Sequence, residues 1–210
     1  MDKRLLISFG LITAAVLTFG CSGGPKPAAA EPKPEPKKEA PKALEPALAQ
    51  SAFNQMYRPA REWAPDALPL TLASGDISGL KNEGGKAAMW TGVFVSPSRH
   101  EARTVIFSAA EHGTRQRGVS LGGAQAWSGA TAKSKPFSPT EFLVNSDQAY
   151  QAAATKAEAW LKKHPDKKLS LYLASASKGT TPVWIVMWGD TKSGYLAFVN
   201  GASGQVVPSR

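Results

Sequence analysis

The sequence predicts an α+β fold built from two similar units, each a helix followed by antiparallel strands. One observation behind this prediction is a duplicated pattern of aromatic and apolar residues, in which Trp63 corresponds to Trp160 and Trp90 to Trp184. The other is a change of period within each copy, from apolar residues at helical spacing to apolar residues at every second position. The predicted parts are a leader at 1–20, a proline-rich tether at 21–48, and the two units at 49–135 and 136–210.

The N-terminal segment has the composition of a bacterial export signal. Lys3 and Arg4 precede the uncharged stretch Leu5–Phe19, and Gly20 then precedes Cys21, the single cysteine of the chain. This arrangement resembles the lipoprotein signal family, in which a small residue stands before a cysteine that receives lipid. The resemblance implies that Cys21 is acylated and becomes the first residue of the mature chain. An uncleaved membrane anchor and an ordinary secretory signal are the two alternatives.

The tether is distinguished by its prolines. Seven prolines lie between residues 22 and 48, interspersed with Lys, Glu and Ala, and aromatic residues are absent. Such a segment cannot bury apolar area, and its prolines favour extended polyproline II structure. We expect a passive, disordered spacer, with a proline-rich docking peptide as the alternative.

The second unit shows the pattern of elements more clearly. Ser146 or Asp147 can cap a helix that runs to about Lys163. Three strands are predicted after it, over 169–173, 181–188 and 195–200, followed by a short pairing segment at 205–207. In the first unit, Pro59 interrupts the helical pattern and is expected to divide the helix.

Alignment of the two copies sets which residues should be equivalent. The offset is 97 residues at Trp63 and Trp160 and 94 at Trp90 and Trp184, and the segment 103–107 is matched with 194–198. We expect each helix tryptophan to pin its helix to its own sheet, so that truncating Trp160 costs about 3 to 5 kcal/mol. Gly122 and Gly123 are interpreted as a turn.

The second copy resembles the PepSY family and its PepSY-like relatives. The residues that carry the resemblance are the helix start 147–150, the strand 183–186, and the strand–turn–strand segments 194–200 and 204–207. The resemblance covers roughly 70 residues well and the first copy poorly. It implies a PepSY/cystatin-like α+β fold, with a helix on a curled antiparallel sheet, and extracytoplasmic binding or protease-inhibitory modules. It implies no catalytic residues.

Motifs of catalysis and metal binding are absent from the sequence. A single cysteine excludes a disulfide framework, and His100, His112 and His164 lack the spacing of a metal motif. There is no nucleophile elbow and no phosphate-binding glycine loop. We therefore expect a non-enzymatic protein without a metal or cofactor, and an enzyme whose site forms only in space is the less favoured alternative.

Charge and unmatched tryptophans supply the candidate ligand-facing residues. The chain carries 25 Lys and Arg against 16 Asp and Glu, a formal net charge of +9. A basic domain near a membrane attracts anionic headgroups or polymers. Trp127 lies outside the repeat and Trp188 near a predicted hairpin end. The candidate ligand-facing residues are Trp127, Trp188, Arg115, Arg117, Lys162 and Lys163.

These features together predict a membrane-anchored extracytoplasmic lipoprotein that binds a protein or an anionic polymer of the cell envelope. Export from the cytoplasm disfavours nucleic acid as a partner. Because Ser22 and not aspartate follows Cys21, we expect anchoring in the outer membrane, facing the periplasm, in a host that has one. The alternative function, suggested by the PepSY resemblance alone, is an inhibitor or regulator of a secreted peptidase.

Overall fold

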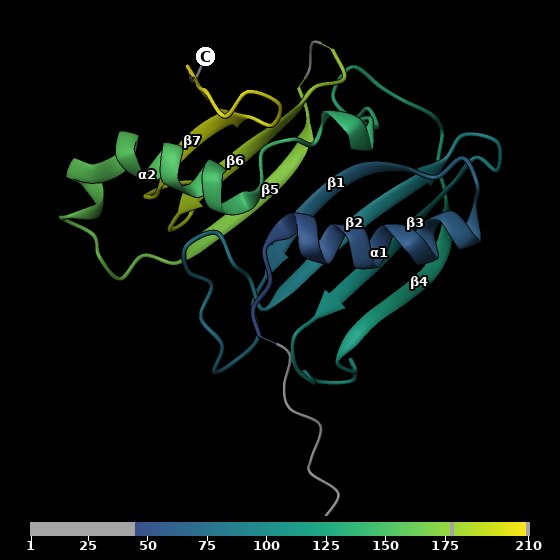
Figure 1. Cartoon of the computed structure of the whole chain (residues 1–210), viewed down its shortest axis with the longest axis horizontal. Helices are drawn as coiled ribbons and strands as arrows, with labels where there is room; N and C mark the ends of the chain where they lie inside the picture. Colours follow the sequence, from purple (N-terminus) through teal and green to yellow (C-terminus); the bar gives the residue numbers. More distant parts are fainter. Residues whose placement is uncertain (1–44, 177–178, 209–210) are drawn as a thin grey trace, which may run out of the picture. The chain divides into compact units, whose positions relative to one another are not determined.

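The computed structural model describes residues 45–176 and 179–208, so the leader, Cys21 and most of the tether lie outside the described residues. All the strands of the described part join one antiparallel sheet, in the order β4-β3-β2-β1-β5-β6-β7-β8, and both helices pack on this sheet (Figure 1). In chain order the elements are α1 Ala49–Trp63, β1 Leu68–Gly75, β2 Met89–Ser96, β3 Glu101–Ser108, β4 Gly118–Ala126, the 3-10 helix Pro139–Glu141, α2 Ser146–Leu161, β5 Leu169–Ser175, β6 Pro182–Trp188, β7 Tyr195–Asn200 and β8 Val206–Val207. The predicted α+β class is confirmed.

The two predicted units are the two halves of this single sheet. Each half has a helix followed by four strands, and the strand order runs outward from the centre in the same way on both sides. The halves meet where β1 pairs with β5, through Leu72 opposite Leu173 and one residue pair on either side. The sheet is therefore continuous across the duplication, which the sequence pattern does not indicate.

The strand tryptophans occupy matching places, as the repeat predicts. Trp90 on β2 and Trp184 on β6 are both fully buried, and their ring centroids lie 6.3 Å apart. The indole N–H of Trp90 donates to the carbonyl of Ala47 (2.8 Å), and that of Trp184 donates to the carbonyl of Val144 (2.9 Å). Each acceptor lies two residues before its helix, so each tryptophan fixes the start of its own helix to its own half of the sheet.

The helix tryptophans also match in position but differ in burial. Trp63 and Trp160 lie in the last turn of α1 and α2, and each contacts the same position of the third strand of its unit, Arg103 or Tyr195. Trp63 is 7% exposed, whereas Trp160 is only partly buried and packs beside His164. The equivalence is confirmed, and the second copy buries its helix end less completely.

The expected break at Pro59 is wrong, because α1 is one continuous helix with Pro59 inside it. Proline in a helix interior costs about 3 kcal/mol through a lost hydrogen bond and a clash with the preceding turn. Ala60 and Trp63 follow the proline and are buried against the sheet. Their burial offsets the local cost, so tertiary packing overrides the sequence signal.

Two details of the alignment also need correction. Phe107 pairs with Trp90 and Val199 pairs with Trp184, so the third strands match at an offset of 92 and not 91. A slip of one residue moves every side chain to the other face of a sheet. Gly122 and Gly123 lie inside β4, at a register shift against β3, and do not form a turn. This strand of nine residues contains three glycines and little apolar alternation, so the sequence did not indicate a strand here.

Among the helices that the structure describes, none is long and apolar enough to span a membrane.

Candidate functional site

The candidate residues from the sequence fall in two groups. Arg115, Arg117 and Trp127 flank β4: the two arginines lie just before it and the tryptophan directly after it. Lys162 and Lys163 follow the end of α2 and are exposed, and Lys162 forms an ion pair with Glu158 (2.7 Å). Trp188 belongs to the second group and lies at the end of β6, where it is 4% exposed. The fold thus does not gather these residues into one site.

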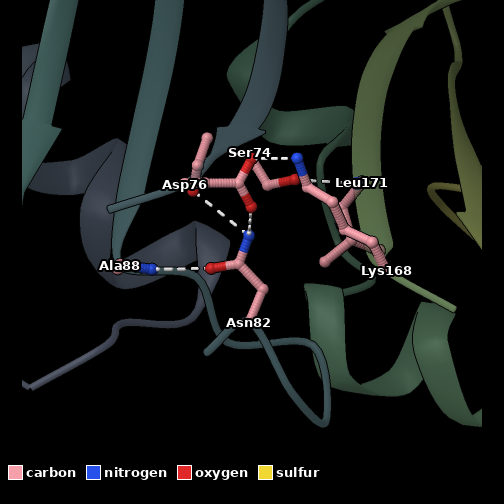
Figure 2. Close-up of polar contacts among 7 residues, drawn as sticks. Ser74, Asp76, Asn82, Ala88, Lys168 and Leu171 are labelled. Atoms are coloured by element: carbon pink, nitrogen blue, oxygen red, sulfur yellow. Dashed lines mark hydrogen bonds and ion pairs between the residues drawn. The ribbon is translucent and has the colours of Figure 1, made fainter. Parts of the chain in front are cut away.

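The junction between β1 and β5 carries a network of polar contacts (Figure 2). The backbone ladder ends at Ala73 and Tyr172, and beyond it the Ser74 hydroxyl accepts a hydrogen bond from the N–H of Leu171 (2.8 Å). The carboxylate of Asp76 forms an ion pair with Lys168 of the other half. A serine side chain and an ion pair thus continue the junction where the two strands separate.

Asn82 holds the loop that precedes β2 against this junction. Its side-chain amide donates to Asp76 Oδ1 (3.1 Å) and to the carbonyl of Gly75 (3.1 Å), and its Oδ1 accepts from the N–H of Ala88 (3.0 Å). Asn82 therefore links both sides of the loop, and Asp76 is contacted by both halves of the sheet (Figure 2).

A cavity of about 500 Å³ lies beside this network. Apolar residues of both halves line it: Leu80, Tyr150, Leu161, Leu169 and Trp188. Charged residues of both signs line the rest: Asp76, Lys81, Glu83, Asp166, Lys167 and Lys168. Asp76 pairs with Lys168, and Glu83 lies 4.0 Å from Lys81. Because these charges largely neutralise one another, the cavity offers no clear preference for an anionic or a cationic ligand.

The sheet face that points away from the helices is a larger candidate. One row of paired residues crosses all eight strands on this face: Ser120, Ile106, Thr91, Ala73, Tyr172, Ile185, Phe198 and Val207. A second row lies beside it: Thr104, Val93, Thr71, Ala174, Val183 and Asn200. We call these two rows the open face. None of their side chains is charged.

The alternate residues of these strands point to the opposite face of the sheet, on which both helices pack. Leu72, Leu173 and Trp184 lie on that face and are buried in the core together with residues of α1 and α2, so no helix within residues 45–176 and 179–208 packs on the open face. On the open face Tyr172 is 38% exposed, and Leu196, two residues along β7 from Phe198, is 44% exposed. Strand patterning from the sequence identified both faces but gave no sign of which one the helices leave uncovered.

The two carboxylates with perturbed ionisation belong to turns. Hydrogen bonds from the Ser96 hydroxyl and the N–H of Ser98 lower the pKa of Asp66 to about 2. The pKa of Asp190 is lowered by the N–H groups of Ser193 and Lys192. Both shifts stabilise the ionised form through local hydrogen bonds, which is typical of loop structure and not of a general acid. Among the described residues, no group of His, Cys, Asp and Glu is placed to hold a metal ion.

The fold and these surfaces define a duplicated α+β protein in which the two helices of the described part leave the uncharged rows of the open face uncovered. No family model matches the chain, and no curated protein matches it. Among solved structures, it is similar to a "putative lipoprotein" from Clostridium difficile 630, with 12% sequence identity and a TM-score of 0.49, over 80% of this chain and 93% of that one. A likeness of this size transfers no function, and the PepSY resemblance stays a prediction.

Proposed function

We propose that this chain is a lipid-anchored extracytoplasmic protein that binds a partner protein, without catalysis, through the open face. The observation that supports this function is the uncharged character of both rows of the open face in a chain of net charge +9. Protein interfaces are depleted of charge at their centre and enriched in aromatic residues, Met and Arg. Tyr172 lies near the middle of the first row, where such a centre would form.

The same observation favours a protein over an anionic polymer as the partner. An anionic polymer is recognised by basic side chains, and the open face has none. A folded protein with its own uncharged, flat surface fits this face, since two sheet-like layers pack closely when their side chains interdigitate. The proposed partner is therefore a protein of the cell envelope. If the partner is a secreted peptidase, the function becomes that of an inhibitor or regulator.

The location of the protein depends on Cys21, which lies outside the described residues. We propose that Cys21 receives lipid and anchors the chain in the outer membrane, facing the periplasm. Because several acyl chains anchor stably, at about 0.8 kcal/mol per buried CH₂, Cys21→Ser should move the protein from the membrane fraction to the soluble extracytoplasmic fraction. Fractionation and labelling with radioactive palmitate measure this. An unchanged membrane fraction or a labelled variant contradicts the proposed anchor.

The proposed docking surface is tested by crosslinking from defined positions. A photoreactive benzoylphenylalanine replaces Tyr172 in the full chain, in the envelope of the producing cell, and captured proteins are identified by mass spectrometry. The matched control carries the same group in place of Gln151, which is exposed on α2. We expect one envelope protein to be captured from position 172 and not from position 151.

The affinity of this chain for the captured protein, once that protein is purified, then gives the contribution of the open face to binding. Tyr172→Glu places a carboxylate in an apolar contact, which costs about 2 kcal/mol or more and weakens binding about 30-fold. Gln151→Glu adds the same charge on α2 and should leave the affinity unchanged. Equal capture from both positions, or equal affinity of the two variants, would falsify docking on the open face.

A further inference from the structure

An arginine–tryptophan cluster lies at the C-terminal end of α1. The Cζ atoms of Arg103 and Arg99 lie 5.2 and 5.8 Å from the ring centroid of Trp63. Trp63 Nε1 and Arg103 Nε are both buried and have no hydrogen-bond partner. Buried N–H groups are nearly always paired, and each exception needs a reason. Neither arginine forms an ion pair with the acidic residues of the described ranges 45–176 and 179–208.

Local hydrogen bonds hold this cluster in place. Asp66 Oδ1 accepts from the Ser96 hydroxyl (2.7 Å), and Asp66 Oδ2 accepts from the N–H of Ser98 (2.8 Å). The Ser96 hydroxyl in turn accepts from the N–H of Arg99 (3.3 Å). These bonds fix the backbone of the turn between β2 and β3, which carries Arg99 and leads directly into the strand that carries Arg103.

Two guanidinium groups with free donors fit an oxyanion. The planar guanidinium presents its N–H groups as a fork that matches a carboxylate or a phosphate in a two-bond geometry. Stacking on an indole leaves the edge of the guanidinium available for this contact.

The neighbouring strand identifies what carries the oxyanion. β4 is an edge of the sheet, and its side chains are exposed along almost all of its nine residues, Gly118–Ala126. Its sequence has no charged residue and no proline, which are two of the devices that protect such edges, and its register shift against β3 lies at Gly122 and Gly123. The opposite edge, β8, has only two residues. A long edge without charge or proline recognises an extended polypeptide, which adds to it as a further strand.

The register places the cluster and the edge on one surface. Arg103 is paired with Ala124 of β4, so the two side chains lie on the helix-covered face. An added strand lies about 5 Å beyond β4, and the small side chain of Ala124 leaves space for a longer side chain to reach Arg103. Beyond the end of β4, the N–H of Trp127 donates to the carbonyl of His100 (2.8 Å), which ties the strand end to the turn next to Arg99.

We propose that β4 and the Trp63–Arg99–Arg103 cluster bind an extended, acidic segment of a polypeptide. The segment pairs its backbone with β4 and places a Glu or Asp carboxylate on the two guanidinium groups. This site is separate from the open face and goes beyond the proposed function. A second copy of this chain fits the edge less well, because β4 contributes no carboxylate to the cluster and Arg115 and Arg117 precede the same strand.

The test uses a bead-bound library of acetylated nonapeptides of random sequence and the full chain in detergent micelles. We expect selected peptides to contain Glu or Asp, to lack proline, and to slow amide hydrogen exchange in Gly118–Ala126. Arg103→Gln should weaken their binding about tenfold or more. Arg61→Gln is the matched control, since Arg61 also lies over an aromatic ring, Tyr57 (5.9 Å), but outside the cluster. A thermal melt of Arg103→Gln verifies that the variant is folded.

Other outcomes overturn the proposal. Selected peptides without acidic residues, no selected peptides at all, or equal binding to Arg103→Gln and wild type remove the role of the cluster. Competition by inorganic phosphate without any change in β4 exchange indicates an oxyanion site alone. Dimers in sedimentation, with β4 protected in the absence of peptide, indicate a second copy as the occupant. Because Tyr172 lies on the other face, Tyr172→Glu should not affect peptide binding. The proposal for this site and the proposal for the open face are therefore tested independently.

Discussion

Replacing Trp184 with alanine should lower the free energy of unfolding by about 3 to 5 kcal/mol. The indole is fully buried between Trp90 (6.3 Å between ring centroids) and Phe142 (5.7 Å). It also donates the hydrogen bond to Val144 that fixes the start of α2. Truncation therefore leaves a cavity at the centre of the sheet and an unpaired carbonyl. A domain of ordinary stability has about 5–15 kcal/mol in total, so this variant should lose a large share of its stability.

Urea denaturation followed by circular dichroism measures this loss, and Trp160→Ala is its matched control. Both changes remove an indole from the second unit, but Trp160 is only partly buried beside Tyr195 and His164. The smaller area removed from contact should cost about 1 to 2 kcal/mol. The larger value that the sequence predicted for Trp160 is thus expected at Trp184. Equal losses in the two variants would show that burial does not decide the contribution of these tryptophans.

Much of the fold could be predicted because its signals are local. The helix 146–161 has an apolar face, although its cap is Asn145 and not the predicted Ser146 or Asp147, and the strands around Trp90 and Trp184 have strong apolar patterns. The duplication then allowed the helix and strands of the first unit to be assigned from those of the second, where the pattern is clearer. The joining of both halves into one sheet was not predicted, because the pairing of β1 with β5 connects residues about a hundred positions apart and depends on three residue pairs.

The candidate sites were predicted less well, for a different reason. Arg115, Arg117 and Trp127 flank β4. The glycines of this strand weaken its sequence pattern, so the strand and the sheet edge that it forms were not predicted. The open face consists of ordinary strand residues such as Ile185 and Phe198, and only the packing of the helices on the other face makes it a surface. Arg103 lies on the same face of β3 as the buried Val105 and Phe107, and a charged residue at this period of two was a signal that could have been used.

The Asn145 side chain accepts hydrogen bonds at the start of both helices, and the Ser146 hydroxyl adds a second acceptor for α1 through the N–H of Ala49 (2.9 Å). Asn145 Oδ1 accepts from the N–H of Ser146 in α2 (2.8 Å) and from the N–H of Gln50 in α1 (3.0 Å), while Gln148 Oε1 accepts from the N–H of Asn145 (2.9 Å). The residue before α1, Leu48, provides no side-chain cap of its own. The N-terminal ends of both helices thus converge on one amide oxygen, where the positive ends of their dipoles also meet.

Asn145→Ala should therefore cost more than the loss of an ordinary cap. One cap contributes about 1 kcal/mol, and removal of a shared acceptor leaves N–H groups of two helices unpaired, so we expect about 2 kcal/mol. Gln148→Ala is the control, because it removes only the return bond to Asn145 in α2 and should cost about 0.5 kcal/mol. Urea denaturation gives the free energies, and hydrogen exchange at Gln50 shows whether α1 is affected. Faster exchange confined to α2 would contradict the shared cap, because a residue that caps α2 alone has no means of loosening a helix that begins 97 positions earlier in the chain.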